Sequence, residues 1–179
     1  MALTVTYRKN IIDSLTGSSN TSSSSNSGLF GGGSRYIGLS FDKPKIDGTG
    51  VREPWPESHD EAHENGYGRA LISAAGQSNT IKFGRANDSG VAENIEHIYF
   101  PEAIKRWTQD GETLKYFVIF NSNVEGSAAS TVLAYAPLKD AEGGDGSISV
   151  NNPNTVVLFR KGDLVIKYVD IYEEEEEEE

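Results

Sequence analysis

The chain of 179 residues contains no cysteine, so it has no disulfide, no thiol nucleophile and no cysteine-ligated metal. Its stability must therefore come from side-chain packing and, where copies associate, from subunit contacts. The chain also lacks an apolar run near the ~20 residues that span a bilayer. The start of the chain does not follow the basic, apolar and small-residue order of a signal peptide, because polar residues interrupt Leu3, Val5 and Ile11. We expect a protein made in the cytoplasm.

Positive charge is scarce, with 16 Lys and Arg against 27 Asp and Glu and a net charge of −11. Seven of the negative charges form the run at residues 173–179, which leaves −4 for the rest of the chain. Nucleic-acid affinity comes mainly from clustered Lys and Arg on phosphate, and here these residues are scattered. The same argument disfavours anionic membrane surfaces. We expect neither nucleic acid nor membrane as a partner.

Composition divides the chain into four parts. Residues 16–34 are almost entirely Ser, Gly, Asn and Thr, which is typical of a flexible linker. The linker separates an N-terminal arm, residues 1–15, from a body of one domain's size, residues 35–172. The final run, residues 173–179, is a poly-Glu tail whose like charges repel one another.

The N-terminal arm has the pattern of a short helix. Its apolar stripe recurs every four residues at Leu3, Tyr7, Ile11 and Leu15, and Gly17 is placed to end it. The alternation of apolar residues over 3–7 leaves a strand open as an alternative. Because an isolated helix of this length is marginal in water, we expect the stripe to dock on a neighbouring subunit, and the chain without residues 1–34 to remain folded.

The body shows short apolar runs separated by Gly, Asn, Asp and Ser. This pattern is typical of an all-β fold, here an antiparallel β-sandwich or jelly roll. The predicted strands cover residues 35–41, 67–74, 80–83, 95–100, 114–120, 131–136, 147–150, 155–159 and 164–169. Residues 116–120 are apolar throughout, which predicts a central strand covered on both faces. We expect tight turns at Asp145-Gly146 and Lys161-Gly162.

Two histidines are the strongest catalytic candidates. His59 and His63 are four residues apart, so on a helix they could bind zinc together with nearby carboxylates. Asp60 stands where zinc proteases have Glu, and the polar setting between prolines and Gly66 favours a surface loop. The acidic run at 140–145 lacks EF-hand spacing and is better interpreted as a solvated turn. We expect no enzyme activity, no cofactor and no metal site, and a metal hydrolase is the least favoured alternative.

Two further features are candidates for binding a partner. Trp55 lies in a proline-containing segment, where an exposed aromatic can anchor a partner, although a large aromatic more often fills the end of a sandwich. The poly-Glu tail, with Glu173, Glu176 and Glu179, either docks on a basic surface of another subunit or acts only to solubilise. A second possibility is a receptor- or glycan-binding module in which Trp55 and Tyr67 face a sugar.

A series of short motifs runs through the body in a fixed order. The motifs are YIGLS at 36–40, GTGV at 48–51 with EP at 53–54, GYGRA at 66–70, IYFPEA at 98–103 with Trp107, YFVIF at 116–120, LAYAPL at 133–138 and GDLVI at 162–166. This order resembles small virion structural proteins of tailed bacteriophages, often labelled tail-fibre or structural (decoration) proteins. The resemblance covers about residues 35–169, together with a short N-terminal helix.

The resemblance implies a non-catalytic virion subunit of the capsid-decoration or tail-fibre type, made in the host cytoplasm. Its partners would be other virion proteins, including copies of itself in a homo-oligomer, and a host-surface receptor or glycan in the second case. Three features depart from the family pattern: the length of residues 16–34, the length of the insertion at 55–65, and the poly-Glu end. These segments are where we expect its partners to differ.

Overall fold

The computed structural model of the chain describes residues 4–18, 33–41, 67–74, 81–100, 113–121, 123, 132–140, 142–149 and 156–167. These residues form one helix and ten strands, and the fold is dominated by antiparallel strands, as predicted. The elements are α1 (Val5–Thr16), β1 (Arg35–Ser40), β2 (Ala70–Ser73), β3 (Val91–Glu93), β4 (Ile98–Tyr99), β5 (Thr113–Leu114), β6 (Tyr116–Phe120), β7 (Val132–Pro137), β8 (Ile148–Ser149), β9 (Leu158–Phe159) and β10 (Val165–Lys167).

Helix α1 begins and ends at residues suited to those positions. The Thr4 hydroxyl caps it by accepting a hydrogen bond from the Tyr7 N–H at 3.3 Å. Gly17 ends it with a φ of 74°, a left-handed conformation that glycine adopts without steric cost. The predicted helix and its end at Gly17 are confirmed, and the strand alternative is wrong for the residues described here.

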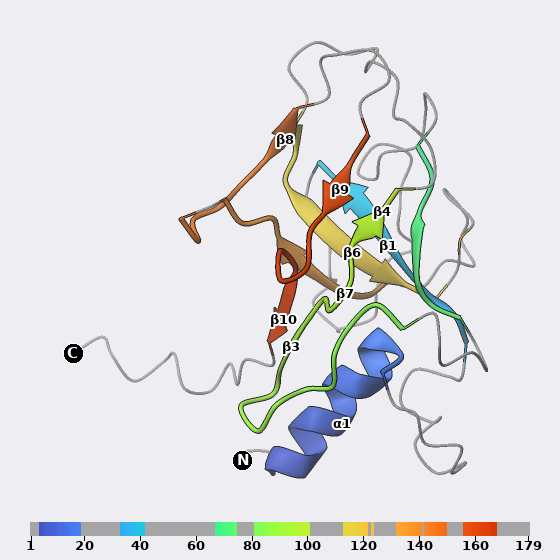
Figure 1. Cartoon of the computed structure of the whole chain (residues 1–179), viewed down its shortest axis with the longest axis vertical. Helices are drawn as coiled ribbons and strands as arrows, with labels where there is room; N and C mark the ends of the chain where they lie inside the picture. The colour runs from blue at the N-terminus through green and yellow to red at the C-terminus, as the bar shows by residue number, and fades with distance from the viewer. Residues whose placement is uncertain are drawn as a thin grey trace, which may run out of the picture.

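Four strands form the main sheet, in the order β2-β1-β6-β7 (Figure 1). All neighbours are antiparallel, and β1 pairs with β6 over five consecutive positions, from Tyr36↔Phe120 to Ser40↔Tyr116. Strand β6 is central, and its last four residues are buried. Phe117 and Ile119 contribute to the larger core cluster, while Val118 contributes to a second cluster. The prediction of a central strand covered on both faces is confirmed.

The remaining strands form three antiparallel pairs, β10-β3, β4-β9 and β5-β8. In the β4-β9 pair, Ile98 and Phe159 are opposite each other and buried, whereas Tyr99 and Leu158 are opposite each other and exposed. Ile98 and Phe159 belong to the same core cluster as Phe117 of the main sheet. The pairs therefore share one hydrophobic core with the sheet.

Several boundaries differ from the sequence prediction. Strand β3 was not predicted, and the strand predicted at 80–83 shows only an isolated bridge, Phe83↔Asn94, among its described residues. The turn at Lys161-Gly162 is confirmed, with a φ of 85° at Gly162.

The turn expected at Asp145-Gly146 begins earlier. Asp145 already pairs with Lys139, so the chain reverses between these two residues. The Asp140 carboxylate accepts hydrogen bonds from the N–H groups of Glu142 (2.9 Å) and Gly144 (2.8 Å), which fixes the reversal. The described residues of this acidic run are exposed, which agrees with a solvated turn.

The N-terminal helix packs on its own chain. Ile12 and Leu15 are buried in the main core cluster, and the Asp13 carboxylate accepts a hydrogen bond from the Ala86 N–H at 2.7 Å. Beyond the helix, the Ser18 hydroxyl donates to the Phe83 carbonyl at 2.9 Å. The expectation of an arm that leaves the body is therefore corrected, because this face of α1 completes the core of its own domain. Figure 1 shows α1 beside the loop that leads into β3.

Candidate partner-binding sites

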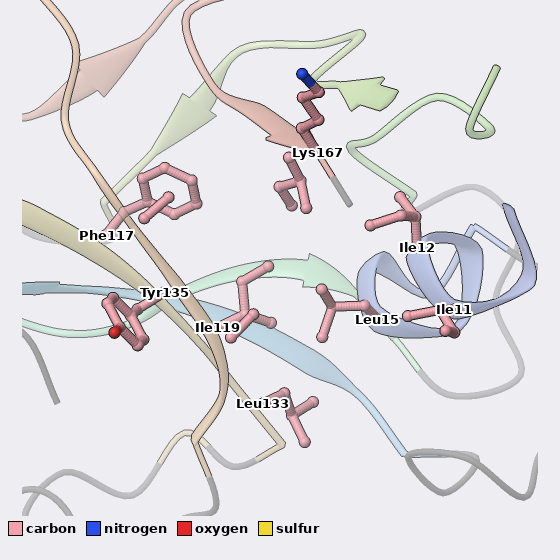
Figure 2. Close-up of a pocket in the computed structure, with 11 residues that line it drawn as sticks. Ile11, Ile12, Leu15, Phe117, Ile119, Leu133, Tyr135 and Lys167 are labelled. Atoms are coloured by element: carbon pink, nitrogen blue, oxygen red, sulfur yellow. The ribbon is translucent and has the colours of Figure 1, made fainter. Parts of the chain in front are cut away.

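An apolar groove of about 250 Å³ lies between α1, the main sheet and β10; we call it the α1 groove. It is lined by Ile11, Ile12, Leu15, Phe117, Ile119, Leu133, Ala134, Tyr135, Ala136, Ile166 and Lys167. Figure 2 shows Ile12 and Leu15 pointing from the helix toward Ile119 of the sheet, with the space between them. The groove is thus built where a helix and an edge strand meet over a shared core.

The lining of the α1 groove suits an apolar group. Most of its side chains are aliphatic or aromatic, and the Lys167 ammonium points away from the centre (Figure 2). Covering apolar surface of this kind stabilises a complex by roughly 25 cal/mol for each Å² removed from water. The groove can therefore accept an aliphatic or aromatic side chain.

The structure separates the four residues of the predicted helical stripe. Ile11 and Leu15 line the α1 groove, and Leu15 is also part of the core. Tyr7 is 43% exposed, and Leu3 lies outside the described residues. The stripe therefore divides into a buried end that stabilises the fold and an exposed end that is open to a partner.

A second site is a wide, shallow hollow of about 530 Å³ beside β4, which we call the Tyr99 hollow. It is lined by Leu71, Lys82, Ile95, Glu96, His97, Ile98, Tyr99 and Lys161. The Lys82 ammonium and the Glu96 carboxylate form an ion pair at 2.5 Å. This hydrogen bond, together with the positive charge of Lys82, lowers the pKa of Glu96 below its ordinary value. Glu96 therefore stays an acceptor across the neutral range.

The second possibility drawn from the sequence needs a correction at Tyr67. Its side chain is buried, its hydroxyl accepts a hydrogen bond from the Leu39 N–H at 3.0 Å, and its ring packs against Phe100. Tyr67 thus belongs to the core and cannot face a sugar. Tyr99, which directly precedes the Phe100 that Tyr67 contacts, is the exposed aromatic of this region.

The other predicted site residues fall outside the described part of the chain. They are Trp55, His59, His63, Glu173, Glu176 and Glu179. Their roles stay predictions. Among the residues that the structure does describe, no group of three or more His, Asp or Glu is arranged to hold a metal ion. No helix in this part of the chain is long and apolar enough to cross a membrane.

Sequence reasoning missed the Tyr99 hollow, although a signal was present. In the order Ile98-Tyr99-Phe100, an exposed tyrosine has one buried residue before it and one after it. This alternation is typical of a strand with one solvated face. The predicted strand over 95–100 carried no assignment of Tyr99 to a solvent-facing side. The lysines come from distant segments, so only the fold brings them to the ring.

The comparisons with known proteins add no relative. No protein-family model matches the chain, and no curated protein is significantly similar to it.

Proposed function

We propose that the chain is a non-catalytic structural subunit of a bacteriophage virion, of the capsid-decoration or tail-fibre type, which acts by binding neighbouring virion proteins and copies of itself. The observation that supports this proposal is the ordered series of motifs in the body. In the structure, three of them coincide with the main sheet: residues 36–40 lie in β1, residues 116–120 are β6, and most of residues 133–138 lie in β7. The resemblance therefore falls on the framework of the fold.

We also propose that the body is a two-layer β-sandwich. One layer is the four-stranded sheet, and the other is formed by the pairs β4-β9 and β3-β10. The support is the shared core, in which Ile98, Phe159 and Ile166 of the pairs join Phe117 and Ile119 of the sheet. Two sheets that pack face to face bury alternate residues of each in this way.

The exposed end of α1 is the surface that we assign to subunit contact. Val5 and Tyr7 are exposed on the first turns of the helix, and the α1 groove opens beside the same element. A tyrosine beside an apolar groove is a favourable anchor for a protein partner, because it contributes a large area with few rotatable bonds. At the other end of α1, Ile12, Ser14, Leu15 and Thr16 are buried in its own domain.

The proposal is tested on particles. Mass spectrometry of purified virions should find the chain in many copies, at a ratio to the major capsid protein that stays constant through successive purification steps. Host cytoplasmic proteins serve as the control, because their ratio falls as purification proceeds. A chain that is lost together with the host proteins would overturn the proposal. Cryo-electron microscopy of the same particles then distinguishes head from tail.

The metal hydrolase alternative at His59 and His63 is tested by elemental analysis. Stoichiometric zinc in the purified chain, lost in a His59→Ala variant, would support that alternative over a purely structural role. Zinc that is absent, or that remains in the variant, would remove it.

A further inference from the structure

The Tyr99 hollow presents an aromatic ring that is both accessible and held in place. Tyr99 is 58% exposed, although the residues before and after it, Ile98 and Phe100, are buried. The His97 ring contacts it edge-on, with centroids 6.2 Å apart and an interplanar angle of 73°. Leu158 lies directly opposite Tyr99 on β9. The contact with His97 therefore restrains the ring, and binding to it costs little additional side-chain entropy.

Charged groups surround this ring. Lys82 and Glu96 form their ion pair within the hollow, and Lys161 also lines it. Lys161 makes no ion pair with any residue that the structure describes. Two lysines against one glutamate give this surface a positive balance on a chain whose net charge is −11. The hollow is thus complementary to an anion.

Part of the backbone at the hollow is already paired. The Lys82 N–H donates to the Ile72 carbonyl at 2.9 Å, and the Lys82 carbonyl accepts from the Ile95 N–H at 2.8 Å. Next to Tyr99, the Phe100 N–H donates to the Val157 carbonyl at 3.2 Å. The side chains that line the hollow offer a ring face, ammonium groups and a carboxylate for recognition.

We propose that the Tyr99 hollow binds an acidic saccharide. A sugar ring has an apolar C–H face that packs on the tyrosine ring, and hydroxyl groups around its edge that pair with both donors and acceptors. Lys82 and Glu96 supply one of each beside Tyr99, and Lys161 supplies the charge for a carboxylate. An apolar wall with a few convergent polar groups is the usual composition of a small-ligand site. This inference does not depend on the virion role.

The test is a calorimetric titration of the full chain with trigalacturonic acid and with 3′-sialyllactose. The neutral counterparts are the methyl esters of the two probes, which lose the carboxylate charge and keep every sugar ring. We expect at least one acidic probe to bind, and its neutral counterpart to bind about fivefold more weakly, because the contact with Lys161 is lost. Added salt should reduce this difference. No binding of either acidic probe, or equal binding of the acid and its neutral counterpart, would overturn the proposal.

Variants locate the site. Tyr99→Ala should weaken binding about tenfold or more, and Lys161→Gln about fivefold. The controls are Val165→Ala, an exposed apolar residue on β10, and Lys115→Gln, an exposed lysine outside the hollow; both should bind as the unchanged chain does. Thermal unfolding should be nearly the same for the Lys161, Val165 and Lys115 variants, since these side chains are exposed, and Tyr99→Ala should stay folded with at most a small loss from the His97 contact.

Two results would refute the saccharide assignment at this stage. The first is a Tyr99→Ala variant that is folded and binds the acidic probe with unchanged affinity. The second is a heptaglutamate peptide that binds more tightly than either saccharide and loses its affinity in the same two variants. In that case the hollow would be a site for an acidic peptide.

Discussion

The four-stranded sheet and the two-stranded pairs keep their strands together in different ways. In the sheet, β1 and β6 are in register over five positions, and β6 is covered on both faces. In the pairs, the strands are two or three residues long, and Tyr99, Leu158 and Val165 on their outer sides face solvent. An isolated pair of such short strands is at best marginally stable in water. The pairs must therefore be held by contacts outside their ladders.

Asn94 supplies such contacts. Its side chain is fully buried, and its amide nitrogen donates to the carbonyls of Glu96 (2.9 Å) and Arg160 (2.7 Å). Its amide oxygen accepts from the Leu164 N–H at 2.8 Å, and its backbone carbonyl accepts from the Gly162 N–H at 2.9 Å. One side chain thus joins the turn between β3 and β4 to the turn between β9 and β10. The sheet distributes its hydrogen bonds over many residues, whereas the pairs β3-β10 and β4-β9 are joined through the single residue Asn94.

The largest effect should follow from a cavity in the sheet. Ile119→Ala removes a fully buried side chain from the central strand, and we expect a loss of about 4 kcal/mol in the free energy of unfolding, measured by urea denaturation. Val165→Ala, on the exposed side of β10, should cost less than about 0.5 kcal/mol. Equal losses in the two variants would show that burial in the sheet does not contribute more to stability than the exposed side of the pairs.

Asn94→Ala should be the most damaging change in the pairs. It removes three side-chain hydrogen bonds and leaves their backbone partners unsatisfied, for which we expect a loss of about 3 kcal/mol. Asn87→Ala is the matched control. The Asn87 amide oxygen accepts hydrogen bonds from two backbone N–H groups, so its side chain bonds to backbone as that of Asn94 does, but Asn87 is exposed. It should cost about 1 kcal/mol or less. If Asn94→Ala is as mild as the control, stability is not concentrated at Asn94.

Substitutions at the two ends of helix α1 should differ in their effect on the free energy of unfolding. Leu15→Ala is expected to cost about 2.5 kcal/mol, because the side chain is buried in the shared core. Val5→Ala, in the exposed first turn, should change the free energy of unfolding by less than about 0.5 kcal/mol. Deletion of residues 1–34 should consequently destabilise the domain. A truncated chain as stable as the full one would show that residues 1–34 do not stabilise the rest of the domain.

The smallest effect concerns the ion pair that joins α1 to the turn before β3. Lys9 and Asp88 are 2.9 Å apart, and this hydrogen bond, with the charge of Lys9, lowers the pKa of Asp88 from its ordinary value of 3.8. Because the folded value is the lower one, the stabilisation is complete above the ordinary value and is lost as the pH falls through the folded value. Asp88→Asn should therefore be slightly less stable than the unchanged chain at about pH 6, and equal to it well below 3.8. A difference that is the same at both pH values would contradict this account.

The sequence predicted the sheet better than the pairs, for a physical reason. Strands β6 and β7 are apolar runs of five and six residues, and β1 has Ile37 and Leu39 two residues apart on one face. Such patterns are recognisable without their partners. Strand β3 has three residues between Gly90 and Asn94, and its conformation depends on pairing with β10. Asn94 itself has the composition of a turn residue, and no local pattern indicates that it is buried.

The candidate sites were predictable only in part. The spacing of the N-terminal stripe identified the helix, but the buried face is centred on Ile12 and Leu15, whereas Tyr7, in the first turns, is exposed. Tyr67 follows Gly66 at the start of a predicted strand, and its neighbours do not show that its hydroxyl bonds to the backbone of β1. Burial of this kind is decided by tertiary contacts, which a single sequence does not contain.

The pairing of β1 with β6 has a consequence for synthesis on the ribosome. Ile37 pairs with Ile119, so the central strand is made long after its neighbour. At 5–20 residues per second, the apolar β1 waits about 4–16 s for β6, with β2 as its only partner in the sheet during that time. Because two strands alone are marginal, the nascent chain should gain protease resistance only once β6 and β7 have left the exit tunnel. Folding of this domain is thus a late event that requires most of the chain.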